Sequence, residues 1–157
     1  MPGDRYQRGA HTVVDLKYHF AWKTKYGYPV LRGNVGLRLR ELVREICVEK
    51  KMSVVTGNVR QNHIHVLVSA PAYLSPAKMV QYLKGKSSYR LLREFPALQK
   101  QYWGQHFWSR GYFCSTVGAV SEKQIKAYIE NQSDGDTNFQ VWDEKEDDDE
   151  EDGSSSV

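Results

Sequence analysis

The chain of 157 residues has few cysteines and no long apolar run. Its two cysteines, Cys47 and Cys114, form no Cys-x-x-Cys pair, so the sequence does not predict a disulfide framework. No apolar stretch approaches the ~20 residues that a membrane-spanning helix needs. Residues 1–11 are polar and lack the apolar centre of a signal peptide. We therefore expect a cytoplasmic protein with reduced cysteines and no membrane partner.

Charge is divided unevenly along the chain. Between Asp143 and Asp152, nine acidic residues stand with a single lysine, a net charge of −8. Because the whole chain has a formal net charge of +3, residues 1–142 carry a net charge of +11. A body this basic favours a polyanionic partner, most simply nucleic acid.

The acidic segment cannot form a packed core. We therefore expect three parts: a flexible N-terminus at 1–10, one folded domain at 11–142 and a disordered acidic tail at 143–157. The simplest role of such a tail is to keep the protein soluble. The alternative is that it competes with nucleic acid for the basic surface.

Hydrophobic patterning predicts a mixed α+β domain. Alternation of apolar residues predicts strands at 13–22, 52–59, 63–69 and 105–117. Helical spacing predicts helices from Asn34 to about Lys50, from Ser75 to about Glu94 and from Ser121 to about Gln132. The first six elements have the ferredoxin-like order βαββαβ, an antiparallel sheet with two helices on one face. The helix from Ser121 is an addition at the C-terminal end.

Two histidines flank one apolar residue in the third predicted strand. Because side chains alternate along a strand, His63 and His65 share one face, while Ile64 and Val66 face the core. Residues two apart on one face lie roughly 7 Å apart, so both imidazoles can reach one metal ion. On its own, such a pair is more typical of a structural or surface role. His19, on the solvent-facing side of its strand, is expected to be a polar neighbour and not a catalytic residue.

Tyr128 and Gln132 lie four residues apart in the last predicted helix and so are neighbours on one face. In an arbitrary helix, Tyr128 would belong to a core stripe and Gln132 would be exposed. Beside a metal site they suit phosphoryl transfer, because a phenol of pKa ~10 is a poor nucleophile unless a metal polarises the phosphate. Two imidazoles and an amide oxygen, without thiolates, favour Mg²⁺ or Mn²⁺.

The helix after Ser75 has a basic centre that contains a glycine. Its residues 84–90 read Lys-Gly-Lys-Ser-Ser-Tyr-Arg. A glycine inside a helix costs roughly 1 kcal/mol relative to alanine, and between two lysines it suits close approach to phosphates. A solvated basic face explains the pattern equally well.

Five stretches together carry a resemblance to a known family. In chain order they occupy residues 18–26, 62–68, 82–88, 107–113 and 125–132. In these stretches the chain resembles the single-tyrosine HUH transposases of the IS200/IS605 insertion-sequence family, including those associated with repetitive extragenic palindromes. The resemblance spans roughly residues 11–132. One histidine pair is a weak signal, whereas all five stretches in register are specific.

The resemblance implies a role for each matching residue. Tyr128 would be the nucleophile and His63, His65 and Gln132 the metal ligands. DNA contact would fall on basic and hydroxyl residues of the second helix, namely Lys84, Lys86, Ser87 and Arg90. Two departures stand out: Asn62 replaces an aspartate that many members have, and the acidic tail has no counterpart.

The resemblance also implies a substrate and an assembly. The protein would bind hairpins in single-stranded DNA, cut one strand through a 5′-phosphotyrosine and rejoin it, which mobilises an insertion sequence. It would be a homodimer with the two sheets joined edge to edge. The tyrosine helix of one subunit could complete the histidine site of the other, with Gly118 as the hinge.

Two other functions fit parts of the sequence. A replication-initiator-like HUH nuclease uses tyrosine and histidines too, but the small size argues against it. A non-catalytic, domesticated single-stranded nucleic-acid binding protein fits the sheet and the basic body equally well. The complete set of His63, His65, Tyr128 and Gln132 favours the transposase, because binding alone does not require it.

Overall fold

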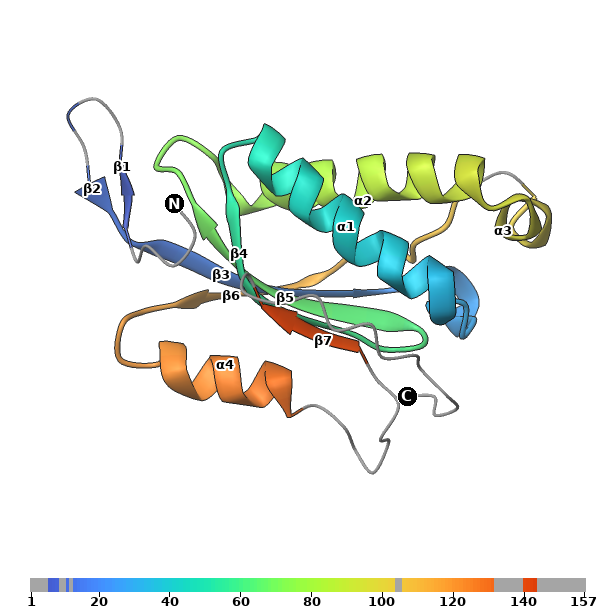
Figure 1. Cartoon of the computed structure of the whole chain (residues 1–157). Helices are drawn as coiled ribbons and strands as arrows, with labels where there is room; N and C mark the ends of the chain where they lie inside the picture. Colours follow the sequence, from blue (N-terminus) through green and yellow to red (C-terminus); the bar gives the residue numbers. More distant parts are fainter. Residues whose placement is uncertain (1–5, 9–10, 12, 104–105, 132–139, 144–157) are drawn as a thin grey trace.

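The fold is a five-stranded antiparallel sheet with helices on both faces (Figure 1). It was obtained as a computed structural model that describes residues 6–8, 11, 13–103, 106–131 and 140–143. The strands run in the order β6-β3-β5-β4-β7. Their bounds are β3 Leu16–Lys23, β4 Ser53–Val59, β5 His63–Ala70, β6 Phe113–Val117 and β7 Gln140–Asp143. Together with the two long helices, strands β3, β4, β5 and β6 give the ferredoxin-like order βαββαβ, which confirms the predicted fold class.

Two long helices cover one face of the sheet and a short helix lies on the other (Figure 1). Helices α1 (Gly33–Glu49) and α2 (Pro76–Glu94) lie together on the first face, and α3 (Pro96–Gln101) follows α2. Helix α4 (Glu122–Glu130) packs on the opposite face, against β4 and β5. The main core lies under α1 and α2 and takes alternate strand residues, including Phe20, Trp22, Ile64, Val66 and Val68.

The helix boundaries differ little from those predicted. Ser75 caps α2 as expected, since its Oγ accepts a hydrogen bond from the Lys78 amide at 3.2 Å. Helix α1 begins at Gly33, so Asn34 lies in its first turn and is not the N-cap. Helix α3 was not predicted, because Pro96 was taken to lie beyond a helix end, whereas it occupies a first helical position.

The fourth strand is shorter than predicted. Only Phe113–Val117 pairs with β3, while Trp108 forms an isolated bridge with Thr24. Between them Gly111 has a φ of +81°, a left-handed conformation that ends the extended run. The aromatic residues before Gly111 are typical of a strand, so the sequence predicted one there, but apart from the Trp108 bridge they do not pair with β3.

The ends of the described chain add short strands that the sequence analysis missed. β1 (Gln7–Arg8) lies inside the segment 1–10 that was expected to be flexible, and it pairs with β2 (Val13–Val14), the start of the run predicted as one strand at 13–22. β7 pairs with the outer edge of β4, so Asp143, predicted to open the tail, ends a strand instead. The rest of the predicted tail and Gln132 lie outside the described residues. Within the described part of the chain, no helix is long and apolar enough to cross a membrane.

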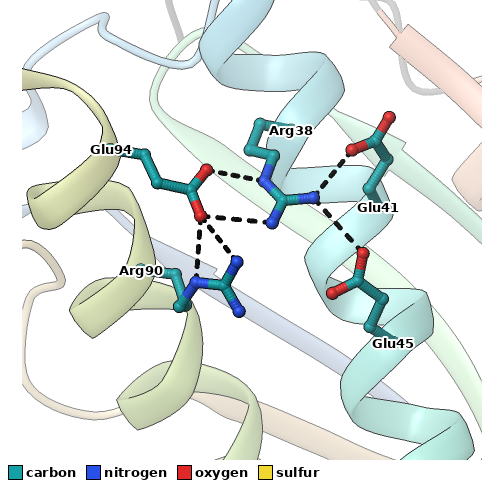
Figure 2. A network of polar contacts seen from close by, with 5 residues as sticks. All are labelled: Arg38, Glu41, Glu45, Arg90 and Glu94. Carbon is teal, nitrogen blue, oxygen red and sulfur yellow. Dashed lines mark hydrogen bonds and ion pairs between the residues drawn. The ribbon is translucent and has the colours of Figure 1, made fainter.

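An ion-pair network joins α1 to α2 on the side away from the sheet (Figure 2). Arg38 donates through Nε and Nη2 to the two carboxylate oxygens of Glu94, at 2.7 and 3.1 Å. Its Nη1 donates to Glu41 and Glu45, and Arg90 donates to Glu94 at 2.9 Å. The bidentate geometry raises the pKa of Arg38 and lowers that of Glu94.

Candidate active site

The register of the sheet places both histidines beside β3. Ala21 lies opposite His65 and Lys23 lies opposite His63 in the β3–β5 ladder. On the other side of β3, Phe113 of β6 is opposite Ala21. Directly opposed residues share a face, so Phe113, Ala21 and His65 form one row across the sheet. Ile64 and Val66 are fully buried under the long helices, which confirms the predicted alternation.

Each histidine is oriented through its Nδ1 atom. Nδ1 of His63 lies 3.0 Å from Oδ1 of Asn62. Nδ1 of His65 lies 3.0 Å from Nε2 of His19. A metal-binding histidine commonly uses its second ring nitrogen in this way, which fixes the ring and its tautomer. Nε2 is therefore the atom through which either histidine would bind a metal.

His19 is the site residue that sequence reasoning set aside. It is buried, and its ring centroid lies 5.3 Å from that of His65 and 6.1 Å from that of Tyr128. The alternation of β3 already placed His19 on the face opposite the core. What the sequence could not supply is the β3–β5 register that brings it next to His65.

Burial keeps these imidazoles neutral. The pKa of His65 falls to about 3, chiefly because its charged form is desolvated and then because His63, His19 and Arg60 oppose a further positive charge. Burial also lowers the pKa of His19. A neutral imidazole is the form that ligates a metal ion, so the environment of His65 suits this chemistry.

Helix α4 brings Tyr128 to the histidines of the same chain. Ile129 packs with Leu67 and Val117, and its carbonyl oxygen accepts a hydrogen bond from Nδ2 of Asn58 at 2.8 Å. Thr56 donates to the Glu130 carboxylate at 3.1 Å. The Tyr128 ring, 51% exposed, lies 6.0 Å from that of His65. Tyr128 is thus not part of a core stripe and stands next to His65.

The residues assigned to DNA on α2 divide into two pairs. Ser87, predicted to contact DNA, is buried, and its hydroxyl accepts a hydrogen bond from the Trp108 indole at 3.0 Å. Nζ of Lys84 donates to the carbonyl oxygens of Ser109 and Gly111, both at 2.8 Å. Both residues hold the segment before β6. The other pair reaches solvent but has acidic partners: Lys86 with Glu49 and Arg90 with Glu94.

A cleft of about 600 Å³ opens beside the histidines. It lies between β5 and the segment that precedes β6. The residues around it combine cations, aromatic rings and one small side chain, and include Ala21, Lys23, His63, Arg110, Tyr112 and Phe113. A volume of this size accommodates a molecule as large as a nucleotide.

The described residues supply two of the three expected metal ligands. Among them, no group of three or more His, Cys, Asp or Glu side chains is arranged to hold a metal ion. A site built on His63 and His65 therefore needs a ligand of another kind, and Gln132, the expected one, lies outside the described residues. Asn62, the first departure from the family pattern expected above, orients His63 through its side-chain oxygen.

Comparison with known proteins gives consistent matches. A family model described as "Transposase IS200 like" matches residues 12–132. The chain is 34% identical over 128 residues to the ISDra2 transposase TnpA of Deinococcus radiodurans, which covers 82% of this chain and 91% of that protein. It is also 34% identical over 123 residues to the transposase for insertion sequence element IS200 of Salmonella typhimurium, covering 78% and 80%.

Two solved structures resemble the fold. A crystal structure from Deinococcus radiodurans R1, assigned as a transposase, superposes with a TM-score of 0.66 at 33% identity, covering 80% of this chain and 97% of that one. A REP-associated tyrosine transposase bound to a REP hairpin gives a TM-score of 0.57 at 9% identity, covering 80% and 71%. At so low an identity the second match shows a shared fold alone.

Proposed function

This chain belongs to the IS200-like transposase family, and from that premise we propose that it cuts and rejoins single-stranded DNA through Tyr128. The observation that carries the proposal is the approach of the Tyr128 ring to within 6.0 Å of the His65 ring, across two elements distant in sequence. A phenol placed beside the neutral His65, whose strand also carries His63, has the geometry of a nucleophile next to a metal site.

The proposed reaction conserves the energy of the phosphodiester bond. The Tyr128 oxygen attacks the scissile phosphorus and loses its proton, while the bond to the 3′ oxygen breaks and that oxygen gains a proton. The products are a 5′-phosphotyrosine and a free 3′-hydroxyl. A 3′-hydroxyl of a second DNA end can reverse the step, so strands are joined without an external energy source.

We propose that His63, His65 and Gln132 hold the divalent metal of this reaction, Mg²⁺ or Mn²⁺. The contacts of both Nδ1 atoms support the assignment of the two histidines. When bound, such an ion polarises the scissile phosphate and stabilises charge on the leaving oxygen. The role of the protein is to fix the two imidazoles, keep that of His65 neutral and place Tyr128 beside it.

The proposed substrate is a hairpin in single-stranded DNA, as the basic body and the hairpin-bound relative both suggest. We keep Lys86 and Arg90 as candidate contacts to the hairpin, since both reach solvent. We take residues 11–142 as the catalytic domain, acting on DNA in the cytoplasm as a homodimer. Here α4 docks on its own chain, so a shared site would need α4 to move about the connection that contains Gly118.

A covalent-adduct assay tests the proposal. Full-length protein is incubated with Mn²⁺ and labelled single strands from the two flanks of its own gene, then separated under denaturing conditions. We expect a labelled protein band that disappears in Tyr128→Phe and in His63→Ala but persists in Tyr73→Phe, a control at a tyrosine that is 74% exposed and outside the site. Hairpin binding without any adduct would instead favour the domesticated binding protein. An adduct that Tyr128→Phe retains would show that another tyrosine is the nucleophile.

A further inference from the structure

The geometry points to a subsite for one unpaired nucleotide of the DNA strand, in the cleft beside the histidines. Its base would stack on Phe113 and its phosphate would lie near Lys23 and Arg110. This inference rests on the proposed function, because it takes single-stranded DNA as the substrate. It adds a location and a chemistry for substrate binding that differ from the contacts expected on α2.

A small residue between two rings creates the space. Phe113, Ala21 and His65 lie in one row on adjacent strands, in that order. Side chains directly opposite one another on neighbouring strands are about 4.5–5.5 Å apart at Cβ, so the outer two rings flank the single methyl group of Ala21. A base entering above Ala21 would therefore touch Phe113 on one side and approach His65 on the other.

Aromatic surface is exposed along this wall of the cleft. Phe113, the first residue of β6, is 53% exposed, and Tyr112, which directly precedes the strand, is 44% exposed. Among the described residues, the ring of His19 contacts that of Phe113, and the two ring planes are inclined at 67°, which is an edge contact and not a parallel stack. Exposed rings beside a cationic groove are the usual platform for bases of single strands, since every base has a face that can stack.

The cations of the cleft differ from those of α2 in their partners. Lys23 and Arg110 are exposed and have no ion pair among the described residues, while Lys86 and Arg90 each pair with a glutamate. A cation without an acidic neighbour attracts a phosphate at a lower cost, because no existing ion pair must be broken. The charge pattern therefore favours the cleft over the α2 surface as the path of the single strand.

The segment that carries Arg110 is held in place before any DNA binds. Ser109 donates its amide to the Lys23 carbonyl and its hydroxyl to the Thr24 carbonyl, both at 2.9 Å. From behind, Lys84 donates to the carbonyls of Ser109 and Gly111. The backbone positions of Lys23 and Arg110 are thereby fixed relative to each other, so that binding has to order only their side chains.

A binding comparison with and without bases tests the subsite. The probes are a labelled oligothymidylate of about twelve nucleotides and a matched abasic strand with the same phosphates, titrated by fluorescence anisotropy against full-length protein in EDTA to prevent cleavage. We expect wild type to prefer the strand with bases on the order of tenfold, since base–aromatic stacking has that strength. Phe113→Leu should remove this preference while leaving abasic-strand affinity unchanged, and Phe113→Trp should retain it.

Matched variants separate stacking from charge. Tyr89→Leu, at a ring that is 60% exposed on α2, should keep the full preference. Arg110→Ala should weaken both strands equally and reduce the slope of log affinity against log salt by about 0.7. An equal loss on both strands in Phe113→Leu, or no loss on either, would overturn the subsite. Covalent-adduct formation is scored separately. If wild type forms the adduct but Phe113→Leu keeps the full preference for the strand with bases, the subsite alone is refuted. If wild type prefers the strand with bases but forms no adduct, the proposed reaction alone is refuted.

Discussion

Nε2 of His19 lies 3.0 Å from Nδ1 of His65, which joins two histidines that stand 46 residues apart in the chain. For His65 to bind a metal through Nε2, its Nδ1 must carry the proton and donate it to His19. His19 is buried and has a lowered pKa, so it is neutral and able to accept. The pair therefore fixes the tautomer of His65 that metal binding requires.

Replacing His19 should weaken metal binding without removing a ligand. Loss of such an outer hydrogen bond typically costs 10–100-fold in metal affinity, so we expect an effect of about that size for Mn²⁺ in His19→Ala. His19→Gln, which keeps an acceptor oxygen, should recover part of the affinity. Titration of the free protein with Mn²⁺, followed by electron paramagnetic resonance, measures both.

The control for that titration is His106→Ala, at an exposed histidine, which should bind Mn²⁺ as wild type does. Unchanged affinity in His19→Ala would show that His65 does not depend on His19 for its tautomer.

The stability of the metal-free protein should fall in acid because of His65. Its pKa is about 3 in the folded protein and near the ordinary 6.5 in the unfolded chain. Between these pH values the unfolded chain binds a proton that the folded protein does not, so the free energy of unfolding decreases as the pH falls from about 6.5 towards 3, by at most about 1.4 kcal/mol per pH unit for this group. Urea unfolding in EDTA at about pH 7 and about pH 4.5 measures the slope. His65→Gln should flatten it, and an identical slope in that variant would contradict the account.

Lys84 should matter for stability more than for electrostatic attraction to DNA. Its ammonium group holds two backbone carbonyls, so Lys84→Met should lower the free energy of unfolding by about 1–2 kcal/mol. The exposed ion pair of Lys86 is weaker, and Lys86→Met should cost less than about 1 kcal/mol. Denaturant unfolding compares the two variants. If Lys84→Met unfolds like wild type but lowers the salt dependence of DNA binding, the side chain contacts phosphate after all.

Asn58 should control how firmly α4 is docked. Its buried amide donates to the Ile129 carbonyl, and Asn58→Ala leaves that carbonyl without this donor. A loss of about 1.4 kcal/mol corresponds to tenfold faster amide exchange in α4, which hydrogen–deuterium exchange detects. Asn34→Ala, at an exposed asparagine in α1, should leave α4 unchanged. Exchange in α4 that Asn58→Ala does not accelerate would show that the apolar contacts of Ile129 alone hold the helix.

Local patterns were enough to predict most elements and the sheet order. The alternation in β3 and β5 and the cap at Ser75 report directly on secondary structure, and only a few topologies suit a βαββαβ order. The segment 107–112 misled the prediction because its aromatic residues resemble a strand. Its conformation depends on Gly111 and on the contact of Trp108 with Ser87, neither of which local composition reveals.

In the candidate site, too, the sequence predicts what depends on local pattern and misses what depends on contacts between distant residues. That His63 and His65 share a face follows from strand geometry, whereas the contact of His19 with His65 depends on strand register, which is set by the whole sheet. Lys84 and Ser87 occupy polar helix positions that look exposed in sequence. Their contacts with the 108–111 segment arise only when residues more than twenty positions away pack against them.

The most direct test of the central claim is to identify the residue that carries the DNA. After reaction with Mn²⁺ and substrate, the adduct is digested with nuclease and protease, and the modified peptide is sequenced by mass spectrometry. The account predicts a phosphotyrosine with a 5′ nucleotide remnant at Tyr128, whose ring lies beside those of His65 and His19. A remnant on Tyr112, which lines the cleft, or on any other residue would contradict it.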